Sequence, residues 1–183
     1  MPVDSDAALL ERVREGDNAA GDVLVRRYHE PLLRYLTRLT GNGHVAEELH
    51  QQTWLSVLEH AEKFDASNTS GGFKAWLFRI ATNKANDVWR SQARDRSAKS
   101  ALQLAGGNES PDAGANMEQS DETEKLRWAI GQLPENQRQV LLLRYYSEMK
   151  FTEIADMLGC PLNTALGRMH KAMLKLKQLM EEN

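Results

Sequence analysis

Four side chains near the C-terminus have the types and spacing of a helix face that contacts nucleic acid. Thr164, Arg168, Lys171 and Lys175 are separated by four, three and four residues, so an α-helix places them on one side. The opposite side is an apolar stripe with the same spacing: Ala165, Met169, Ala172, Leu176 and Leu179. Hydroxyl and guanidinium groups donate hydrogen bonds to phosphates and base edges. The pattern favours a DNA-binding helix over its alternative, an amphipathic helix with a solvated basic face.

The residues before this helix predict a helix-turn-helix. Thr152 is expected to cap a short helix over 152–158, and Gly159 supplies the turn. Asn163 or Thr164 then caps the second helix, over 164–180, which is the one that enters a major groove in such motifs. Gly167 has no side chain and would allow the second helix to approach the DNA backbone closely.

A second set of donors lies on a helix predicted over 73–94. Its expected core side carries Phe73, Leu77, Ile80 and Val88, and its polar side is rich in amide and guanidinium groups: Arg79, Asn83, Asn86, Arg90 and Arg94. With Trp76 and Trp89 nearby and the polar loop 65–72 before it, this surface could hold unstacked bases. The alternative is that the two tryptophans belong to the core.

A third helix, predicted over 45–63, has a different chemistry. Trp54, Val57, Leu58 and Ala61 are expected to form its inner stripe. The outer face combines acids, amides and one apolar side chain: Glu47, Glu48, Gln51, Gln52 and Leu55. Such a face suits a protein partner better than DNA. A merely solvated helix side is the alternative.

Charges are segregated along this chain, whose net charge is −3. Residues 1–65 carry seven basic and twelve acidic side chains, whereas residues 66–96 carry six basic and two acidic ones. Residues 158–180 contain four basic side chains and no acid. Two basic islands in an acidic chain indicate two local anion-binding faces and argue against non-specific coating of DNA.

The elements that must position these faces are all predicted to be helices, because apolar residues recur at three- and four-residue spacing. Further helices are expected over 6–15, 19–39 with an interruption near Pro31, 122–132 and 135–146. The stretch 97–121 is acidic, rich in small and polar residues, and predicted to be a flexible linker. The prediction is an all-α fold with an N-terminal helical bundle, 1–96, and a C-terminal helix-turn-helix domain, 122–183.

The composition argues against several other classes of function. Cys160 is the single cysteine, so it has no second thiol for an intramolecular disulfide or a zinc site. Five candidate ligands do not combine into a coordinating pattern: His29, His44, His50, His60 and Glu47. No phosphate-binding glycine loop or recognisable nucleophile is present. No metal, cofactor or catalytic residue is therefore expected. With no signal peptide or long apolar run, a cytoplasmic protein without membrane insertion is predicted.

Taken in chain order, these segments resemble the extracytoplasmic-function group of bacterial sigma factors over almost the whole chain. GDNAAGDVLVRRYHEPLLRYLTRL resembles the first core helices of that family, and AEELHQQTWL its polymerase-binding helix. WLFRIATNKANDVWR resembles a family pattern carried here by Trp76, Asn83, Asp87 and Arg90. LPENQRQVLLLRYYSEMKFTEIADMLGCPLNTALGRMHKA resembles the C-terminal helix-turn-helix domain.

The resemblance implies a transcription initiation factor that binds core RNA polymerase and directs promoter recognition and melting. Polymerase binding would involve Glu47, Glu48, Gln51, Gln52, Trp54 and Leu55. The downstream promoter element, melted with bases flipped from the non-template strand, would be contacted by Ser67, Asn68, Lys74, Trp76, Arg79, Asn83, Lys84, Asp87 and Arg90. The upstream element, read as duplex, would be contacted by Asn163, Thr164, Leu166, Gly167, Arg168, Lys171 and Lys175. An anti-sigma factor is a further implied partner.

Two departures from the family pattern concern these sites. Glu48 stands where many relatives have aspartate, which keeps the charge. In the recognition helix, the usual Thr-Val-Lys-Ser-Arg run is replaced by residues 164–168, Thr-Ala-Leu-Gly-Arg, so a lysine and a hydroxyl are missing. Weaker or altered upstream recognition is expected. The remaining alternative is a stand-alone helix-turn-helix regulator, which would need a dimer interface and a palindromic operator.

Overall fold

The computed structural model describes residues 4–65, 69–102 and 121–182, and within these ranges it contains helices and no strand, which confirms the all-α prediction. The N-terminal module consists of α1 (Asp6–Arg14), α2 (Asn18–Thr40), α3 (Gly43–Glu59), the short 3₁₀ helix η1 (Ala61–Lys63) and α4 (Gly72–Leu102). The C-terminal module consists of α5 (Asp121–Gly131), α6 (Glu135–Tyr146), α7 (Phe151–Leu158) and α8 (Leu162–Glu182). None of the described helices is long and apolar enough to cross a membrane.

Several predicted boundaries were wrong. Pro31 does not interrupt α2, which is continuous because a buried row from Leu24 to Leu39 holds both halves against the core. The helix expected to end at residue 94 continues to Leu102, and so enters the stretch predicted as linker; residues 103–120 of that stretch lie outside the described ranges.

The predicted caps of the helix-turn-helix were also wrong. Helix α7 begins one residue earlier than expected, and the backbone N–H of Lys150 donates to Glu153 Oε2 at 2.7 Å, so Thr152 lies inside the helix. Helix α8 begins at Leu162, and the carbonyl of Pro161 accepts from the N–H groups of Thr164 and Ala165. Gly159 does adopt the left-handed conformation, with φ 63°, at the turn between the two helices.

The core of the N-terminal module lies between α2, α3 and α4. Tyr35 of α2 and Phe78 of α4 are fully buried, with ring centroids 5.3 Å apart. The Tyr35 hydroxyl and Thr82 Oγ1 are 2.7 Å apart, which satisfies both polar groups inside the core. This packing fixes the rotation of α4 and therefore which of its residues face outward.

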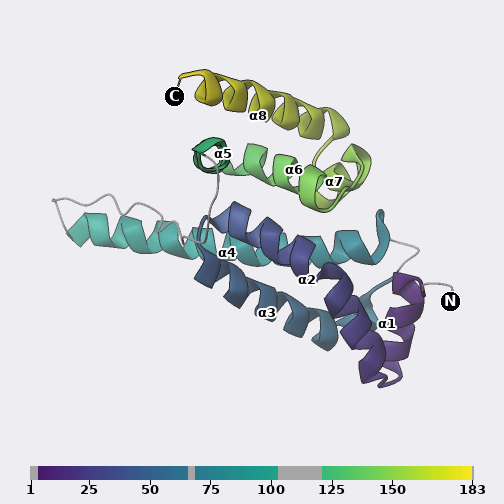
Figure 1. Cartoon of the computed structure of the whole chain (residues 1–183). Helices are drawn as coiled ribbons and strands as arrows, with labels where there is room; N and C mark the ends of the chain where they lie inside the picture. The colour runs from purple at the N-terminus through teal and green to yellow at the C-terminus, as the bar shows by residue number, and fades with distance from the viewer. Residues whose placement is uncertain (1–3, 66–68, 103–120, 183) are drawn as a thin grey trace.

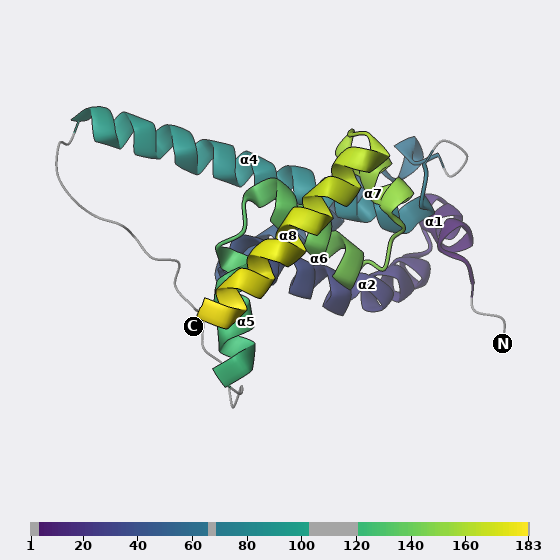
Figure 2. The same ribbon diagram turned by 90° about the horizontal axis from the view of Figure 1, so that it is seen from above.

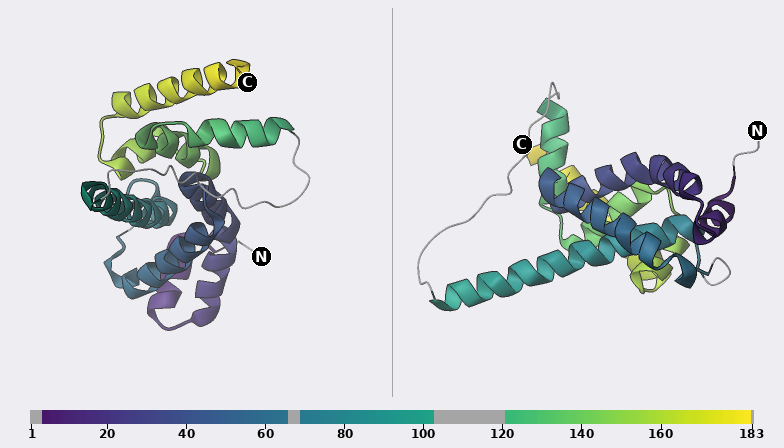
Figure 3. Two further views of the ribbon diagram at one scale, coloured as in Figure 1. Left: turned by 90° about the vertical axis from the view of Figure 1, so that its left-hand side faces the viewer. Right: turned by 90° about the horizontal axis from the view of Figure 1, so that it is seen from below.

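The C-terminal module packs directly on the N-terminal one. Helices α5, α6 and α7 form a layer between α8 and the α2–α4 layer, and α3 lies on the side away from α8 (Figure 1). Viewed from above, α8 crosses over α6, while α4 projects beyond the rest of the bundle (Figure 2). The side and bottom views show the same stacking and the same projection of α4 (Figure 3).

Helix α6 is covered on two sides. Val140, Leu142 and Leu143 belong to the same buried cluster as α2 and α4, whereas Leu141 packs against the smaller cluster that joins α5 to α8. A helical turn that is apolar around its whole circumference, as residues 140–143 are, must be enclosed. Part of the apolar surface that the C-terminal module buries is therefore buried against the N-terminal module.

Candidate protein and nucleic-acid interfaces

One side of α3 is an exposed surface with mixed chemistry. Glu47, Glu48, Gln51 and Leu55 are exposed, and the Gln52 side chain donates to Glu48 Oε1 at 3.0 Å. Leu55 is 59% exposed, which is unusual for a leucine on a packed helix. An apolar side chain ringed by acids and amides has the composition of a protein-binding surface.

Two residues of α3 lie on different sides of the helix from those predicted. Leu58 was expected in the core, which is wrong: its side chain is 53% exposed and lies one turn after Leu55 on the same face. Trp54, placed by the family resemblance among the polymerase contacts, is only 7% exposed. We name the exposed side the α3 surface: Glu47, Glu48, Gln51, Gln52, Leu55 and Leu58.

The polar group of buried Trp54 has a partner within the same helix. Its indole Nε1–H donates to His50 Nε2 at 3.2 Å, so that nitrogen of the buried imidazole must be unprotonated. The His29 ring meets the His50 ring edge-on at a centroid distance of 4.7 Å. Burial, and then the positive charge of His29 when protonated, lower the pKa of His50.

This arrangement predicts that acid destabilises the fold. Above about pH 6.5, the ordinary value for histidine, His50 is neutral in folded and unfolded chains alike. As the pH falls through that value, the unfolded chain binds a proton that folded His50 does not, and the free energy of unfolding decreases. Urea unfolding at about pH 7.5 and pH 5.5 should show this decrease, and His50→Gln should make it smaller.

His44→Gln is the matched control, because it removes one histidine from an exposed position at the start of the same helix. An equal reduction of the pH dependence in both variants would contradict the assignment to His50.

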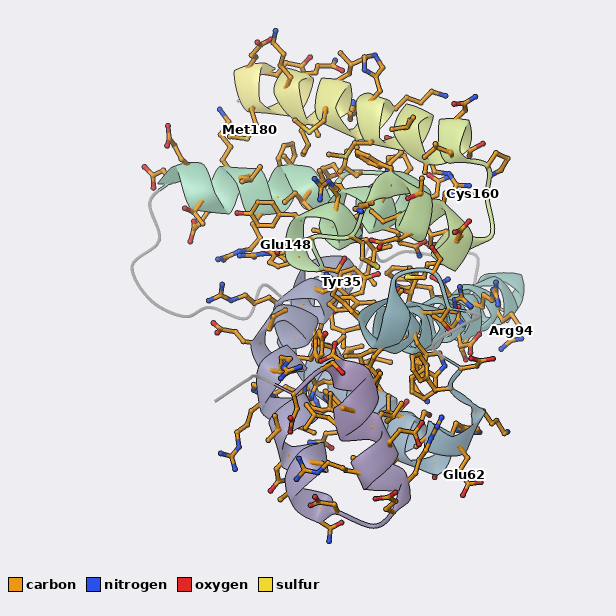
Figure 4. The ribbon with its side chains drawn as sticks, turned by 90° about the vertical axis from the view of Figure 1, so that its right-hand side faces the viewer. Tyr35, Glu62, Arg94, Glu148, Cys160 and Met180 are labelled. Atoms are coloured by element: carbon orange, nitrogen blue, oxygen red, sulfur yellow. The ribbon has the colours of Figure 1, made fainter. Side chains whose placement is uncertain are left out.

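Helix α4 presents the expected polar side, part of which is exposed. Asn83, Asp87 and Arg90 are exposed, and Arg90 forms a 3.4 Å surface ion pair with Asp87. Lys74, Arg79 and Lys84 are half-buried. Ser67 and Asn68, predicted in the preceding loop, lie outside the described residues. In a side-chain view, Arg94 lies on the part of α4 that projects away from the bundle (Figure 4).

Neither tryptophan of α4 is a free stacking platform. Trp76 is half-buried, with its ring centroid 5.2 Å from Phe64 and 6.0 Å from Phe73. Trp89 is also half-buried and packs against the core cluster. A large part of each tryptophan ring therefore belongs to the core, as the alternative interpretation predicted. Only the remaining exposed edges of the two rings are available to a base.

Helix α8 matches the predicted division into two sides. Its apolar stripe is buried at Ala165, Ala172, Leu176 and Leu179 and half-buried at Met169. The other side is accessible: Asn163, Thr164, Leu166 and Lys171 are exposed, and Gly167, Arg168 and Lys175 are half-buried. A Cβ atom added at Gly167 would meet no atom within 4 Å, so packing within the chain does not require glycine there.

Part of each basic face lines one shared cavity between the modules. Arg79, Thr82, Asn83 and Asn86 of α4 line it from one side, and from the other it is lined by Gln139, Met157, Leu158 and Arg168. No carboxylate is among these lining residues, and Arg79 Nε is buried without a hydrogen-bond partner. The two guanidinium groups thus share a polar cavity that contains no acid to offset their charge.

The residues that join the two modules were not among those predicted from the sequence. Gln139 Nε2 donates to Asn86 Oδ1 at 2.6 Å, and Arg138 donates to the carbonyl of Leu39 at 3.1 Å. Arg138 also donates to Gly131 and Leu133 carbonyls of its own module, and its burial lowers its pKa. The signal that could have indicated this interface is the run of four apolar residues, 140–143, which leaves that turn of α6 without a polar side.

No described group of three or more histidine, cysteine, aspartate or glutamate side chains is arranged to hold a metal ion. Three described surfaces carry groups suited to binding partners: the α3 surface, the polar side of α4 and the basic side of α8.

Comparisons with known proteins agree with this arrangement. Residues 24–95 match the family model for sigma-70 region 2, and residues 123–176 match that for sigma-70 region 4. The first match accounts for most of the N-terminal module and so does not favour a stand-alone regulator with a sensor domain. The two matches flank the stretch for which a linker was predicted.

Two curated relatives extend the likeness to nearly full length. The RNA polymerase sigma-H factor of Pseudomonas aeruginosa is 28% identical over 92% of this chain and 90% of its own length. The ECF RNA polymerase sigma factor SigW of Bacillus subtilis is 26% identical over 94% of this chain and 95% of its own.

A solved structure has the same fold. A chain from the structure of CnrH in complex with the cytosolic domain of CnrY matches with a TM-score of 0.73 and 24% identity, covering 98% of this chain and 99% of the other. Helical architecture, both family regions in their expected order and full-length relatives agree: the chain belongs to the extracytoplasmic-function group of sigma factors, which bind RNA polymerase and direct promoter-dependent initiation of transcription.

Proposed function

We propose that this sigma factor docks on core RNA polymerase through the α3 surface. The observation that carries the proposal is the exposed pair Leu55 and Leu58, surrounded by Glu47, Glu48, Gln51 and Gln52. Buried apolar anchors within a polar rim supply most of the energy of protein interfaces. Trp54 then acts indirectly, by packing α3 against Phe73 of α4.

The DNA contacts are proposed to divide between α4 and α8. The α4 residues Lys74, Arg79, Asn83, Lys84, Asp87 and Arg90, with Trp76 and the preceding Ser67 and Asn68, hold the melted downstream element. Amide and guanidinium groups suit this role because they bind exposed base edges and the sugar-phosphate backbone. Asn163, Thr164, Leu166, Gly167, Arg168, Lys171 and Lys175 of α8 contact the upstream element as duplex.

The stretch 97–121 is proposed to be the linker between a core-binding domain, 1–96, and an upstream-element domain, 122–183. A tether allows both DNA elements to be engaged on a rigid polymerase. The chain acts by binding and not by catalysis, and it acts in the cytoplasm, where polymerase and promoters meet. An anti-sigma factor is a proposed regulatory partner, by analogy with the solved complex of the sigma factor RpoE with the anti-sigma factor NepR from Bartonella quintana.

A capture experiment with bacterial core RNA polymerase tests the docking surface. The double variant Gln51→Ala, Leu55→Ala should bind core polymerase about 10- to 100-fold more weakly, because an apolar anchor and its polar neighbour are lost together. Both side chains are exposed, so the circular dichroism spectrum and unfolding midpoint should stay unchanged. A Trp54→Ala variant would not test docking, because it also removes a core side chain.

Asp22→Ala, Val23→Ala is the matched control, since it removes one polar and one exposed apolar side chain from α2. Equal affinity of the two double variants for core polymerase would overturn the proposal that α3 is the docking surface.

A further inference from the structure

The cavity between the two modules has the composition of a binding site for a small anion. We propose that it binds a phosphate dianion, either free orthophosphate or the terminal group of a small phosphate monoester. This ligand goes beyond the proposed polymerase and promoter contacts, although Arg79 and Arg168 take part in both. The cavity lies where α7 meets α4 and the start of α8 (Figure 1).

Two cations from different modules line this cavity. Arg79 comes from α4 and Arg168 from α8, and none of the described residues that line the cavity is an acid. Glu135 accepts a long hydrogen bond from Gln139, at 3.4 Å, but it is exposed and does not line the cavity. Two cations that share a cavity repel each other, so a ligand with two negative charges is favoured there.

The chain itself satisfies the donors of these arginines poorly. Arg79 Nε is buried and has no hydrogen-bond partner among the described residues, and the bond from Arg79 Nη2 to the Asp156 carbonyl is long, at 3.4 Å. Arg168 Nη1 donates to Cys160 Sγ, a weak acceptor, at 3.8 Å. Because buried donors normally have a partner, these groups favour an acceptor from outside the chain.

Two amide groups extend the donor set on the same side of α4. Asn83 and Asn86 follow Arg79 by four and seven residues, so the helix places the three side chains together. Asn86 Oδ1 accepts from Gln139 Nε2 at 2.6 Å, which leaves the Asn86 Nδ2–H group to donate elsewhere. Phosphate oxygens accept from several donors at once, and guanidinium groups bind them in pairs.

The size of the cavity limits the ligand. Its volume is about 130 Å³, whereas a single water molecule needs about 10–15 Å³ of such space, so a group of several atoms can enter. Met157 and Leu158 of α7 supply an apolar wall, which keeps water from part of the site and strengthens ion pairing. Free phosphate or a small monoester fits this space better than a polymer does.

Isothermal titration calorimetry of the full chain with sodium orthophosphate tests the site. The titration is made at about pH 8, above the second pKa of a phosphate monoester, which is about 6. Ionic strength is held constant with sodium chloride. We expect a dissociation constant on the order of 1 mM or lower. Arg79→Gln and Arg168→Gln should each weaken binding about 10- to 100-fold, because each removes charge-assisted hydrogen bonds.

Arg94→Gln and Lys177→Gln are the matched controls. Each removes one cation from the same helix, α4 or α8, at an exposed position that does not line the cavity. Both should bind orthophosphate as the wild type does. Equal weakening in all four variants would assign the binding to diffuse attraction by the basic faces and overturn the site. Absence of binding to the wild type up to about 10 mM would also overturn it.

Asn83→Asp provides a second test that does not depend on losing an arginine. It supplies the acid that the cavity lacks with little change in shape, and its carboxylate can pair with Arg79 one turn earlier. The variant should therefore stay folded, by circular dichroism, and lose orthophosphate binding. Gln132→Glu, its control, adds the same charge at an exposed residue between α5 and α6 and should keep binding. Retained binding by Asn83→Asp would contradict the site.

Two small esters distinguish a free anion from the DNA backbone as the source of the phosphate. Glycerol 3-phosphate is a dianion, whereas dimethyl phosphate carries one charge, as each phosphate of DNA does. Dimethyl phosphate should bind at least about tenfold more weakly, because one charge cannot pair with both guanidinium groups. Equal binding of the two esters would assign the cavity to the DNA backbone and overturn the proposed ligand. These titrations contain no polymerase or DNA, so their failure is distinct from failure of the proposed function, which polymerase capture measures.

Discussion

Replacement of Phe78 by alanine is expected to lower the free energy of unfolding by about 3–5 kcal/mol, the cost of a cavity left by a large aromatic side chain. Phe78 is fully buried and its ring lies edge-on against Tyr35. Because a domain is commonly stable by only about 5–15 kcal/mol, this single change should remove a large share of the total. Urea unfolding followed by circular dichroism measures it.

Leu58→Ala is the informative control for this prediction. Leu58 is 53% exposed, so the variant should unfold within about 0.5 kcal/mol of the wild type. The pair also tests the corrected rotation of α3, because Leu58 in the core would give a loss comparable to that of Phe78. A small effect of Phe78→Ala would contradict the packing between α2 and α4.

The loss at Phe78 should also reach the side of α4 that is proposed to contact DNA. Tyr35 contacts both Phe78 and the Thr82 hydroxyl, and Thr82 lies one residue before Asn83. The core thus determines the direction in which Asn83 and Arg79 point. A variant that remains folded yet binds single-stranded DNA poorly would indicate that the orientation of α4, and not its charge alone, limits binding.

Helix positions and faces followed from local periodicity, and these predictions largely held. The α8 stripe from Ala165 to Leu179 is a repeat of three and four, which any amphipathic helix must bury. The helix-turn-helix turn was located by Gly159, whose left-handed backbone conformation glycine adopts without strain. Such features depend on residues close together in the sequence.

The errors arose where distant contacts compete with local preference. Pro31 ought to interrupt a helix, yet packing of the neighbouring Leu32 and Tyr28 keeps α2 continuous. Trp54 and Leu58 both suit an inner stripe, and only the position of Phe73 on another helix decides that Trp54 is inside. The hydrogen bond between Gln139 and Asn86 joins residues 53 positions apart, and the apolar run 140–143 indicates only that α6 is covered, not by which helix.

The proposed contacts of α8 give the largest expected effect on promoter binding. Arg168→Gln, Lys171→Gln and Lys175→Gln together should weaken holoenzyme binding about a hundredfold near physiological salt. The slope of log affinity against log salt should decrease in magnitude by about 2–3, because each lost cation no longer releases a counterion from a phosphate. The measurement uses a duplex selected from a randomised pool by the wild-type holoenzyme.

Lys177→Gln is the control for this triple variant. Lys177 lies off the Arg168 side of α8 and is 3.8 Å from Glu181, with both side chains exposed, so its loss should leave the slope nearly unchanged. Residues 165–167 lack the lysine and serine usual in the family, so the remaining three cations should carry most of the upstream affinity. An unchanged slope in the triple variant would assign upstream recognition to another surface. A reduced slope with an unchanged sequence preference would mean that these cations contact phosphates, and that Asn163 and Thr164 contact the bases.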